Sequence, residues 1–223
     1  MANALREWYW SVRRHGLRQV VGEQASALGA RIHVEQLKYN RVVMEKFANH
    51  GAAAAPVFAK AILSVWPDVR SMADFGCGTG HYVAAFRDQG VMATGYERSS
   101  HGRRYAAKRL GLTIEPFDLR AVGPTAPVEM AMSLEVIEHL TPELGERLLD
   151  VITRSPRVAF SGAQVGQGGI DHINEQTLEF WRARFEARGY AFCQAETSAV
   201  REQMRAVVTT PWLATNVMLF RRR

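Results

Sequence analysis

The residues with the clearest chemical potential are a glycine-rich turn and an acidic residue that follows it. The turn reads Asp74-Phe75-Gly76-Cys77-Gly78-Thr79-Gly80. Glycines permit a tight turn and a close approach of the backbone to a ligand. Glu97 ends the next predicted strand, and a carboxylate there can accept strong hydrogen bonds from the two hydroxyls of a ribose. Together they indicate a nucleoside-binding site.

A second group of chemically capable residues follows the fourth predicted strand. Glu135, Glu138 and His139 are spaced so that one helical turn would project them to the same side. His172 lies in a glycine-rich loop after the fifth predicted strand, and such loops often carry binding residues. Carboxylates and imidazoles can bind a divalent cation. They can equally form an acid–base cluster with shifted pKa values, and both uses stay open.

The elements that must position these residues are visible as a change of pattern at Ser71. From there, short apolar runs alternate with segments of helical spacing, which is typical of βαβ units. We expect strands near 71–75, 91–96, 112–116, 128–134, 156–161, 190–196 and 214–221. We expect helices near 80–89, 101–110, 142–153 and 176–188. This predicts an α/β fold with a Rossmann-like, seven-stranded, mostly parallel sheet and helices on both faces.

The first part of the chain, residues 1–66, has helical spacing throughout and is predicted to be a separate segment. Pro56 suits the first turn of a helix that ends near Trp66. Glycines at four positions are expected to separate the helices: Gly16, Gly22, Gly29 and Gly51. The segment is rich in aromatic residues, which at this density usually pack onto a core; they include Trp8, Tyr9, Trp10, Tyr39 and Phe47. The segment is therefore expected to cover a site in residues 67–223 or to form a dimer contact.

Composition limits the remaining possibilities. A length of 223 residues suits one α/β domain with a helical extension. The two cysteines, Cys77 and Cys193, give neither a disulfide framework nor zinc-ligand spacing, and they favour a reducing cytoplasm. We expect no signal peptide and no contact with a membrane. The net charge of +6 could attract an anionic substrate or nucleic acid, or could simply be solvated.

The glycine turn distinguishes between two families that bind nucleosides on such a sheet. The dinucleotide fingerprint G-x-G-x-x-G requires a third glycine at the position that His81 occupies. The pattern here, G-x-G-x-G preceded by Asp74, resembles motif I of class I S-adenosylmethionine (SAM)-dependent methyltransferases, and the resemblance extends over about residues 51–220. It implies SAM as cofactor, with Glu97 on the ribose and Asp118 on the adenine. The implied cofactor-binding set is Asp74, Phe75, Gly76, Cys77, Gly78, Gly80, Tyr82, Glu97, Arg98, Asp118, Leu119, Ser133, Leu134 and Glu135.

Two narrower resemblances point to different acceptors. The segment from Gly166 through the run 172–176 to Trp181 looks like bacterial methyltransferases of small-molecule and glycan biosynthesis. Four further residues resemble the metal-binding quartet of small-RNA 3′-terminal 2′-O-methyltransferases: Glu135, Glu138, His139 and His172. The Glu-x-x-Glu-His pattern also occurs in methyltransferases without a catalytic metal.

The sequence therefore predicts methyl transfer from SAM to an oxygen or nitrogen of a small-molecule acceptor, such as a sugar or a natural product. His172 is the first candidate for the base and His139 the second, with Glu138 in the same cluster. One alternative is a metal-dependent RNA 2′-O-methyltransferase. Another is a SAM-binding Rossmann module without catalytic activity. A homodimer is compatible with each of these functions.

Overall fold

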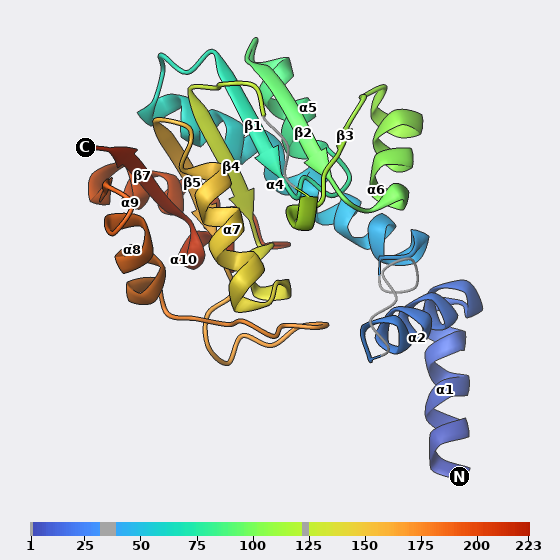
Figure 1. Ribbon diagram of the computed structural model, residues 1–223. Coiled ribbons are helices and arrows are strands. Elements are labelled where there is room, and N and C mark those ends of the chain that lie inside the picture. Colours follow the sequence, from blue (N-terminus) through green and yellow to red (C-terminus); the bar gives the residue numbers. More distant parts are fainter. Residues whose placement is uncertain (1, 32–38, 122–124) are drawn as a thin grey trace.

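A mixed sheet forms the centre of the molecule in the computed structural model, which describes residues 2–31, 39–121 and 125–223 (Figure 1). Its strands lie in the order β3-β2-β1-β4-β5-β7-β6. They are β1 (Ser71–Phe75), β2 (Met92–Glu97), β3 (Glu115–Pro116), β4 (Met130–Leu134), β5 (Arg157–Ser161), β6 (Tyr190–Phe192) and β7 (Met218–Arg222). β7 is antiparallel to both neighbours and the other pairs are parallel. The expected fold class is confirmed.

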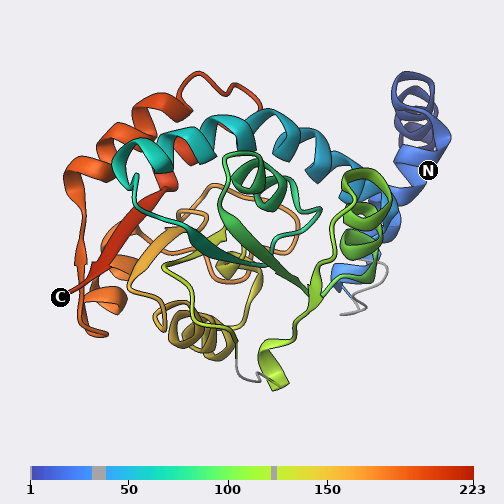
Figure 2. The same ribbon diagram turned by 90° about the horizontal axis from the view of Figure 1, so that it is seen from above.

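Helices cover both faces of this sheet (Figure 2). One face carries α4 (Arg41–Val65), α5 (His81–Asp88) and α9 (Gln194–Met204), and the other carries α7 (Pro142–Ile152) and α8 (Leu178–Glu186). α6 (Ser100–Tyr105) lies beside β2 and β3. The buried apolar side chains divide in the same way, with Phe58 and Phe86 in one cluster and Phe160 and Phe185 in the other. Two apolar layers therefore hold the sheet between them.

Helices predominate among the described residues of the N-terminal segment, but only one of the four expected glycine breaks occurs. Gly16, with a φ of 85°, separates α1 (Ala2–His15) from α2 (Leu17–Arg31). Gly22 and Gly29 lie inside α2, and Gly51 lies inside α4. The reason at Gly22 is packing, because a Cβ there would lie 2.4 Å from Cγ2 of Val42. A glycine at a helix crossing allows two backbones to approach closely.

The helix expected to begin at Pro56 is instead the second half of α4. The Asn40 side chain caps this helix by accepting a hydrogen bond from the Val42 amide at 2.9 Å. Pro56 lies on an exposed face within the helix. The continuous helix is stabilised by packing of its buried face, for example at Phe58 and Ile62, against the sheet.

The late part of the chain also differs from expectation. The strand expected over 190–196 ends at Phe192, and α9 follows, with Val200 and Met204 buried at helical spacing. α10 (Leu213–Asn216) replaces the first half of the strand expected over 214–221. β3 keeps only the end of its expected range, and a π-helical turn, Ala106–Leu110, ends the helix expected over 101–110. Among the described helices, none combines the length and apolar character needed to cross a membrane.

Candidate active site

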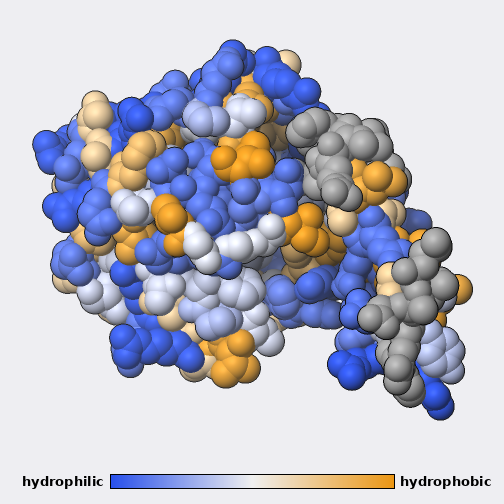
Figure 3. All heavy atoms as spheres, turned by 90° about the horizontal axis from the view of Figure 1, so that it is seen from below, coloured by the Kyte–Doolittle hydropathy of each residue, from blue (hydrophilic) through white to orange (hydrophobic). Residues whose placement is uncertain are grey.

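A pocket of about 1130 Å³ lies beyond the carboxyl ends of β1, β2 and β4. The chain order of the sheet reverses here, since β2 and β3 lie on one side of β1 while β4 and β5 lie on the other. Ligands of open α/β sheets bind at such a switch point. α1, α2 and α4 contribute lining residues from the opposite side. Figure 3 looks onto this end of the molecule, where the surface is hollowed beside the N-terminal helices.

The glycine turn forms one wall of the pocket. Gly76, Gly78 and Gly80 have φ angles of 82°, 55° and 81°, which other residues rarely adopt. The amides of Gly76 and Cys77 donate to the carbonyl of Tyr96 at 2.8 and 3.1 Å, which ties the turn to β2. A Cβ at Gly78 would meet no atom within 4 Å. The backbone of Gly78 therefore borders open space in the pocket, whereas Gly80 is the N-cap residue before α5 and lies outside the pocket lining.

Glu97 joins this turn to α6. Its Oε2 accepts from the Gly78 amide at 2.9 Å, and its Oε1 accepts from the Ser99 amide at 2.5 Å. Gly102 of α6 packs against the same turn, because a Cβ there would lie 2.4 Å from the carbonyl oxygen of Gly78. The two backbone hydrogen bonds fix the direction of the carboxylate, and each carboxylate oxygen can accept from more than one donor.

Three ionisable side chains in and next to the turn are buried. Burial, with a smaller contribution from the negative charge of Glu97, raises the pKa of Asp74 to about 8. Burial also raises the pKa of the Cys77 thiol and of the Tyr82 hydroxyl. The ring of Tyr82 packs edge-on against Phe58, with 5.6 Å between centroids. Asp74 is therefore mostly protonated at neutral pH.

Aromatic rings extend the pocket toward β3. Phe75 and Tyr96 stack with 4.9 Å between centroids, and Phe117 packs against both rings. Beyond them, an oxygen of Asp118 lies 3.5 Å from Nε of Arg98. The lining here includes Tyr96, Arg98, Phe117, Asp118, Leu119 and Arg120. A flat apolar surface next to a carboxylate is complementary to an adenine ring, whose faces are flat and whose amino group can donate a hydrogen bond.

The end of β4 lies next to the glycine turn. Ser133 is buried and donates to the carbonyl of Phe75 at 2.8 Å, so it joins β4 to β1 and lies outside the pocket lining. Leu134 and Glu135 do line the pocket. Glu135 has a φ of 52°, in the left-handed region.

Because of that conformation, the helical turn expected through Glu135, Glu138 and His139 does not form, and only Ile137–His139 makes a 3₁₀ turn. The carboxylate of Glu135 instead accepts from the side-chain amides of Asn216 at 3.2 Å and Gln167 at 3.1 Å. Burial raises the pKa of Glu135, and these hydrogen bonds oppose the increase.

Glu138, His139 and His172 form a compact cluster, in which one ligand atom of each lies within 4.8 Å of the others. Glu138 is 1% exposed, and its Oε2 has no hydrogen-bond partner among the described residues. Burial, followed by the charge of Glu135, raises the pKa of Glu138 to about 8. Nδ1 of His139 lies 3.2 Å from the carbonyl oxygen of Asp171. The cluster can exchange protons or hold a cation.

The sequence and the structure were compared with those of known proteins. No protein-family model matches the sequence, and no curated protein matches it. SAM-bound CalS10, an amino pentose methyltransferase from Micromonospora echinaspora involved in calicheamicin biosynthesis, superposes with a TM-score of 0.58 and 16% identity over 78% of this chain and 92% of its own. The sugar N-methyltransferase KedS8 from Streptoalloteichus gives a TM-score of 0.58 and 16% identity over 78% of this chain and 88% of its own.

The small RNA methyltransferase HEN1 gives a TM-score of 0.56 and 17% identity over 74% of this chain, but only 25% of its own length. The chain has the fold of a SAM-dependent methyltransferase. Within this methyltransferase fold, the structure brings together three of the four residues predicted to bind a metal: Glu138, His139 and His172. The fourth, Glu135, is not a member of that cluster.

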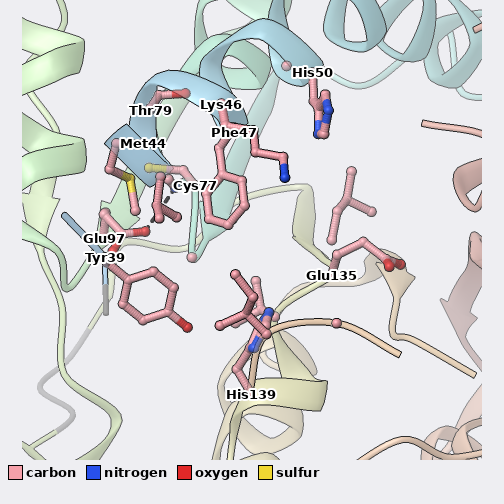
Figure 4. A pocket seen from close by; sticks show the side chains of 18 of the residues that line it. Tyr39, Met44, Lys46, Phe47, His50, Cys77, Thr79, Glu97, Glu135 and His139 are labelled. Carbon is pink, nitrogen blue, oxygen red and sulfur yellow. Dashed lines mark hydrogen bonds between the residues drawn. The ribbon is translucent and has the colours of Figure 1, made fainter. Parts of the chain in front are cut away.

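Part of the opposite wall of the pocket comes from the N-terminal segment, which was expected to cover a site, but none of the residues of this wall was predicted as a site residue. Several come from α4 and the residue before its cap, and Figure 4 shows these side chains facing Glu135 and His139 across the cavity. They are Tyr39, Met44, Lys46, Phe47 and His50. The ring of His50 packs against Trp212 with 5.7 Å between centroids. Only the aromatic character of Tyr39 and Phe47 gave a signal in the sequence.

Proposed function

We propose that this protein transfers a methyl group from SAM to an oxygen or nitrogen of a small-molecule acceptor. The observation that carries the proposal is the hydrogen-bonded pair of Glu97 and the accessible Gly78 backbone in a pocket of the methyltransferase fold. The similarity to CalS10 and KedS8 over most of their own lengths favours a sugar or related natural product as acceptor.

The residues of the pocket fit SAM. Glu97 would hold the ribose hydroxyls, Asp118 the adenine amino group, and Gly76 and Gly78 the methionine part. The Asp74 carboxyl has a raised pKa, so a cation bound nearby would favour its ionised form. The volume of about 1130 Å³ slightly exceeds that of ordinary ligand pockets, which leaves room for an acceptor beside the cofactor.

SAM supplies an activated methyl group, which leaves its sulfur as the acceptor atom attacks. The protein must align the acceptor, and such alignment can lower a barrier by up to roughly 7–11 kcal/mol. A hydroxyl or protonated amine must also lose a proton. His172 is the first candidate to accept it and His139 the second, with the buried Glu138 completing the cluster.

Calorimetric titration with SAM and S-adenosylhomocysteine, followed by a screen with labelled SAM, tests the proposal. The screen offers amino sugars, hydroxylated small molecules and RNA. Absence of SAM binding contradicts the proposal. Tight binding without transfer to any acceptor supports a non-catalytic SAM-binding module instead. Once an acceptor is known, His172→Gln and His139→Gln identify the base, whose loss lowers turnover roughly 10²–10⁴-fold.

A second candidate function is metal-dependent 2′-O-methylation of RNA. The buried Oε2 of Glu138, which has no hydrogen-bond partner among the described residues, lies beside two imidazoles and favours this function, since such a donor set suits a divalent cation. The similarity to HEN1 also supports it. Labelling of RNA that depends on added metal would select this function over the first.

The N-terminal helices are proposed to cover the acceptor. His15, Arg18 and Glu23 from α1 and α2 line the pocket, so the helices border the space left beside the cofactor. A homodimer contact through the same helices is the alternative. We also propose a cytoplasmic location, which the two unpaired cysteines, Cys77 and Cys193, support.

A further inference from the structure

One carboxylate organises the whole loop that carries His172. Oε2 of Glu175 accepts from the amide of Gly166 at 2.8 Å, and Oε1 accepts from the amide of Gly168 at 2.7 Å. The same Oε1 lies 2.9 Å from Nδ1 of His172. Gly166 and Gly168 have φ angles of 84° and 69°. Glycines in the left-handed region of φ let backbone amides close together in the chain point toward one anion.

We propose that Glu175 is the positioning residue for His172. An ionised carboxylate only accepts hydrogen bonds, so the ring nitrogen that faces Glu175 must carry the hydrogen. Nδ1 is therefore the protonated nitrogen of the neutral ring, and Nε2 is left with its lone pair. Glu175 itself is not among the residues that line the pocket, so it acts on the pocket through His172 and the loop. The inference rests on the proposed function, in which Nε2 serves the acceptor.

The other side of the imidazole is fixed by the loop backbone. A Cβ at Gly169 would lie 2.3 Å from Nε2 of His172, so a larger residue there would displace the ring. The His172 and His139 rings meet edge-on with 4.9 Å between centroids. The side chains of His172 and Glu175 are 12% and 18% exposed. The pair is thus largely shielded from water, which strengthens a hydrogen bond to an ionised group.

The loop is also held to the 3₁₀ turn that carries Glu138 and His139. The amides of Ile173 and Asn174 donate to the carbonyl oxygen of Glu138 at 2.8 and 3.1 Å. Glu175 thus connects the glycine half of the loop to a segment that is already attached to the cluster. Without this carboxylate, the positions of the Gly166 amide, the Gly168 amide and the His172 ring would no longer be coupled.

The experiment compares Glu175→Ala and Glu175→Gln with a control, Glu179→Gln, which changes an exposed carboxylate in the first turn of α8. Nitrogen NMR spectra of ¹⁵N-histidine-labelled free protein report which ring nitrogen of His172 carries the hydrogen. Hydrogen exchange reports the protection of the Gly166 and Gly168 amides. Steady-state kinetics with an acceptor gives kcat and the KM for SAM.

We expect the Nδ1–H form of His172 to dominate in the wild type and in Glu179→Gln. In Glu175→Ala it becomes the minor form, both glycine amides exchange faster, and kcat falls about 10–100-fold with the KM for SAM unchanged. Glu175→Gln, which keeps one acceptor oxygen, gives intermediate values.

A wild-type ring with its hydrogen on Nε2 overturns the proposal. So does an unchanged tautomer in both Glu175 variants, even when the glycine amides lose protection, because Glu175 would then only close the loop. The tautomer is measured on the free protein, so this result does not depend on SAM binding. Failure of the proposed function would appear separately, as absence of SAM binding or of transfer.

Discussion

The carboxylate of Glu97 accepts hydrogen bonds from the Gly78 and Ser99 amides, and the same residue lines the pocket. We predict that Glu97→Ala weakens SAM binding by about 1.5–3 kcal/mol, the usual contribution of a hydrogen bond to a charged group. This corresponds to about 10–150-fold in Kd, measured by calorimetry. The matched control is Glu115→Ala, an exposed acid on β3. Equal affinities for the two variants would show that Glu97 does not hold the cofactor.

Asp74 links the site to the pH dependence of stability. The pKa of Asp74 is about 8 in the folded protein, whereas an aspartate without interactions has a pKa of 3.8. Between these values the folded state binds more protons than the unfolded state, so the free energy of unfolding falls as pH rises from about 4 to about 8. We predict that Asp74→Asn removes this contribution and flattens the pH profile, as measured by urea denaturation at several pH values.

The control for Asp74→Asn is Asp88→Asn, at the exposed end of α5. It should leave the pH profile as it is in the wild type. A wild-type stability that is constant or rises between about pH 4 and pH 8, with Asp74→Asn behaving identically, would contradict a protonated Asp74.

The cluster of Glu138, His139 and His172 leads to a prediction about metal. A sulfonium donor is already activated and needs no Lewis acid, and Glu135 lies outside the group of converging ligand atoms. We therefore predict that methyl transfer to a small-molecule acceptor survives exhaustive chelation unchanged. Loss of activity that Mn²⁺ or Mg²⁺ restores, and that His172→Ala abolishes permanently, would favour the RNA-directed alternative.

At the scale of elements, the sequence was most informative where the candidate site is formed by residues close together in the chain. The turn from Asp74 to Gly80 and the acid Glu97 could be predicted, because short motifs at strand ends determine them. The bond from Gln167 to Glu135 and the cavity position of Lys46 depend on how distant elements pack, and no local pattern shows this. α9 was missed because its buried Thr197, Val200 and Met204 follow an apolar strand without a clear break.

The contact between α6 and the glycine turn gives an element-level test. A Cβ at Gly102 would lie 2.4 Å from the carbonyl oxygen of Gly78 and 3.3 Å from Cγ of Glu97. We predict that Gly102→Ala separates α6 from the turn and weakens SAM binding, since overpacking of this kind costs about 1–3 kcal/mol. Arg104→Ala, on the exposed side of the same helix, is the control. Unchanged SAM affinity with lowered thermal stability would mean that the helix moves and the turn does not.

At the scale of the whole molecule, the pocket is assembled from parts far apart in the sequence. The strand ends of the sheet and the loops after them supply one side, while α1, α2 and α4 supply the other side. The ion pair between Arg18 and Glu45, at 3.2 Å, and the crossing at Gly22 attach α2 to α4. Neither contact involves a residue of the glycine turn. Displacement of α2 should therefore affect the acceptor more than SAM.

Gly22→Leu tests whether α2 affects binding of the acceptor more than binding of SAM. A Cβ at position 22 would lie only 2.4 Å from Cγ2 of Val42, so leucine must push α2 away from α4. We predict an increase of about tenfold in the KM for the acceptor, equivalent to about 1.4 kcal/mol, with the Kd for SAM unchanged. Gln24→Leu adds the same side chain at an exposed position of α2 and should behave as the wild type. A weaker Kd for SAM would assign the helices to the cofactor instead. Conversion of a dimer to a monomer in gel filtration, with both constants unchanged, would assign them to a subunit contact.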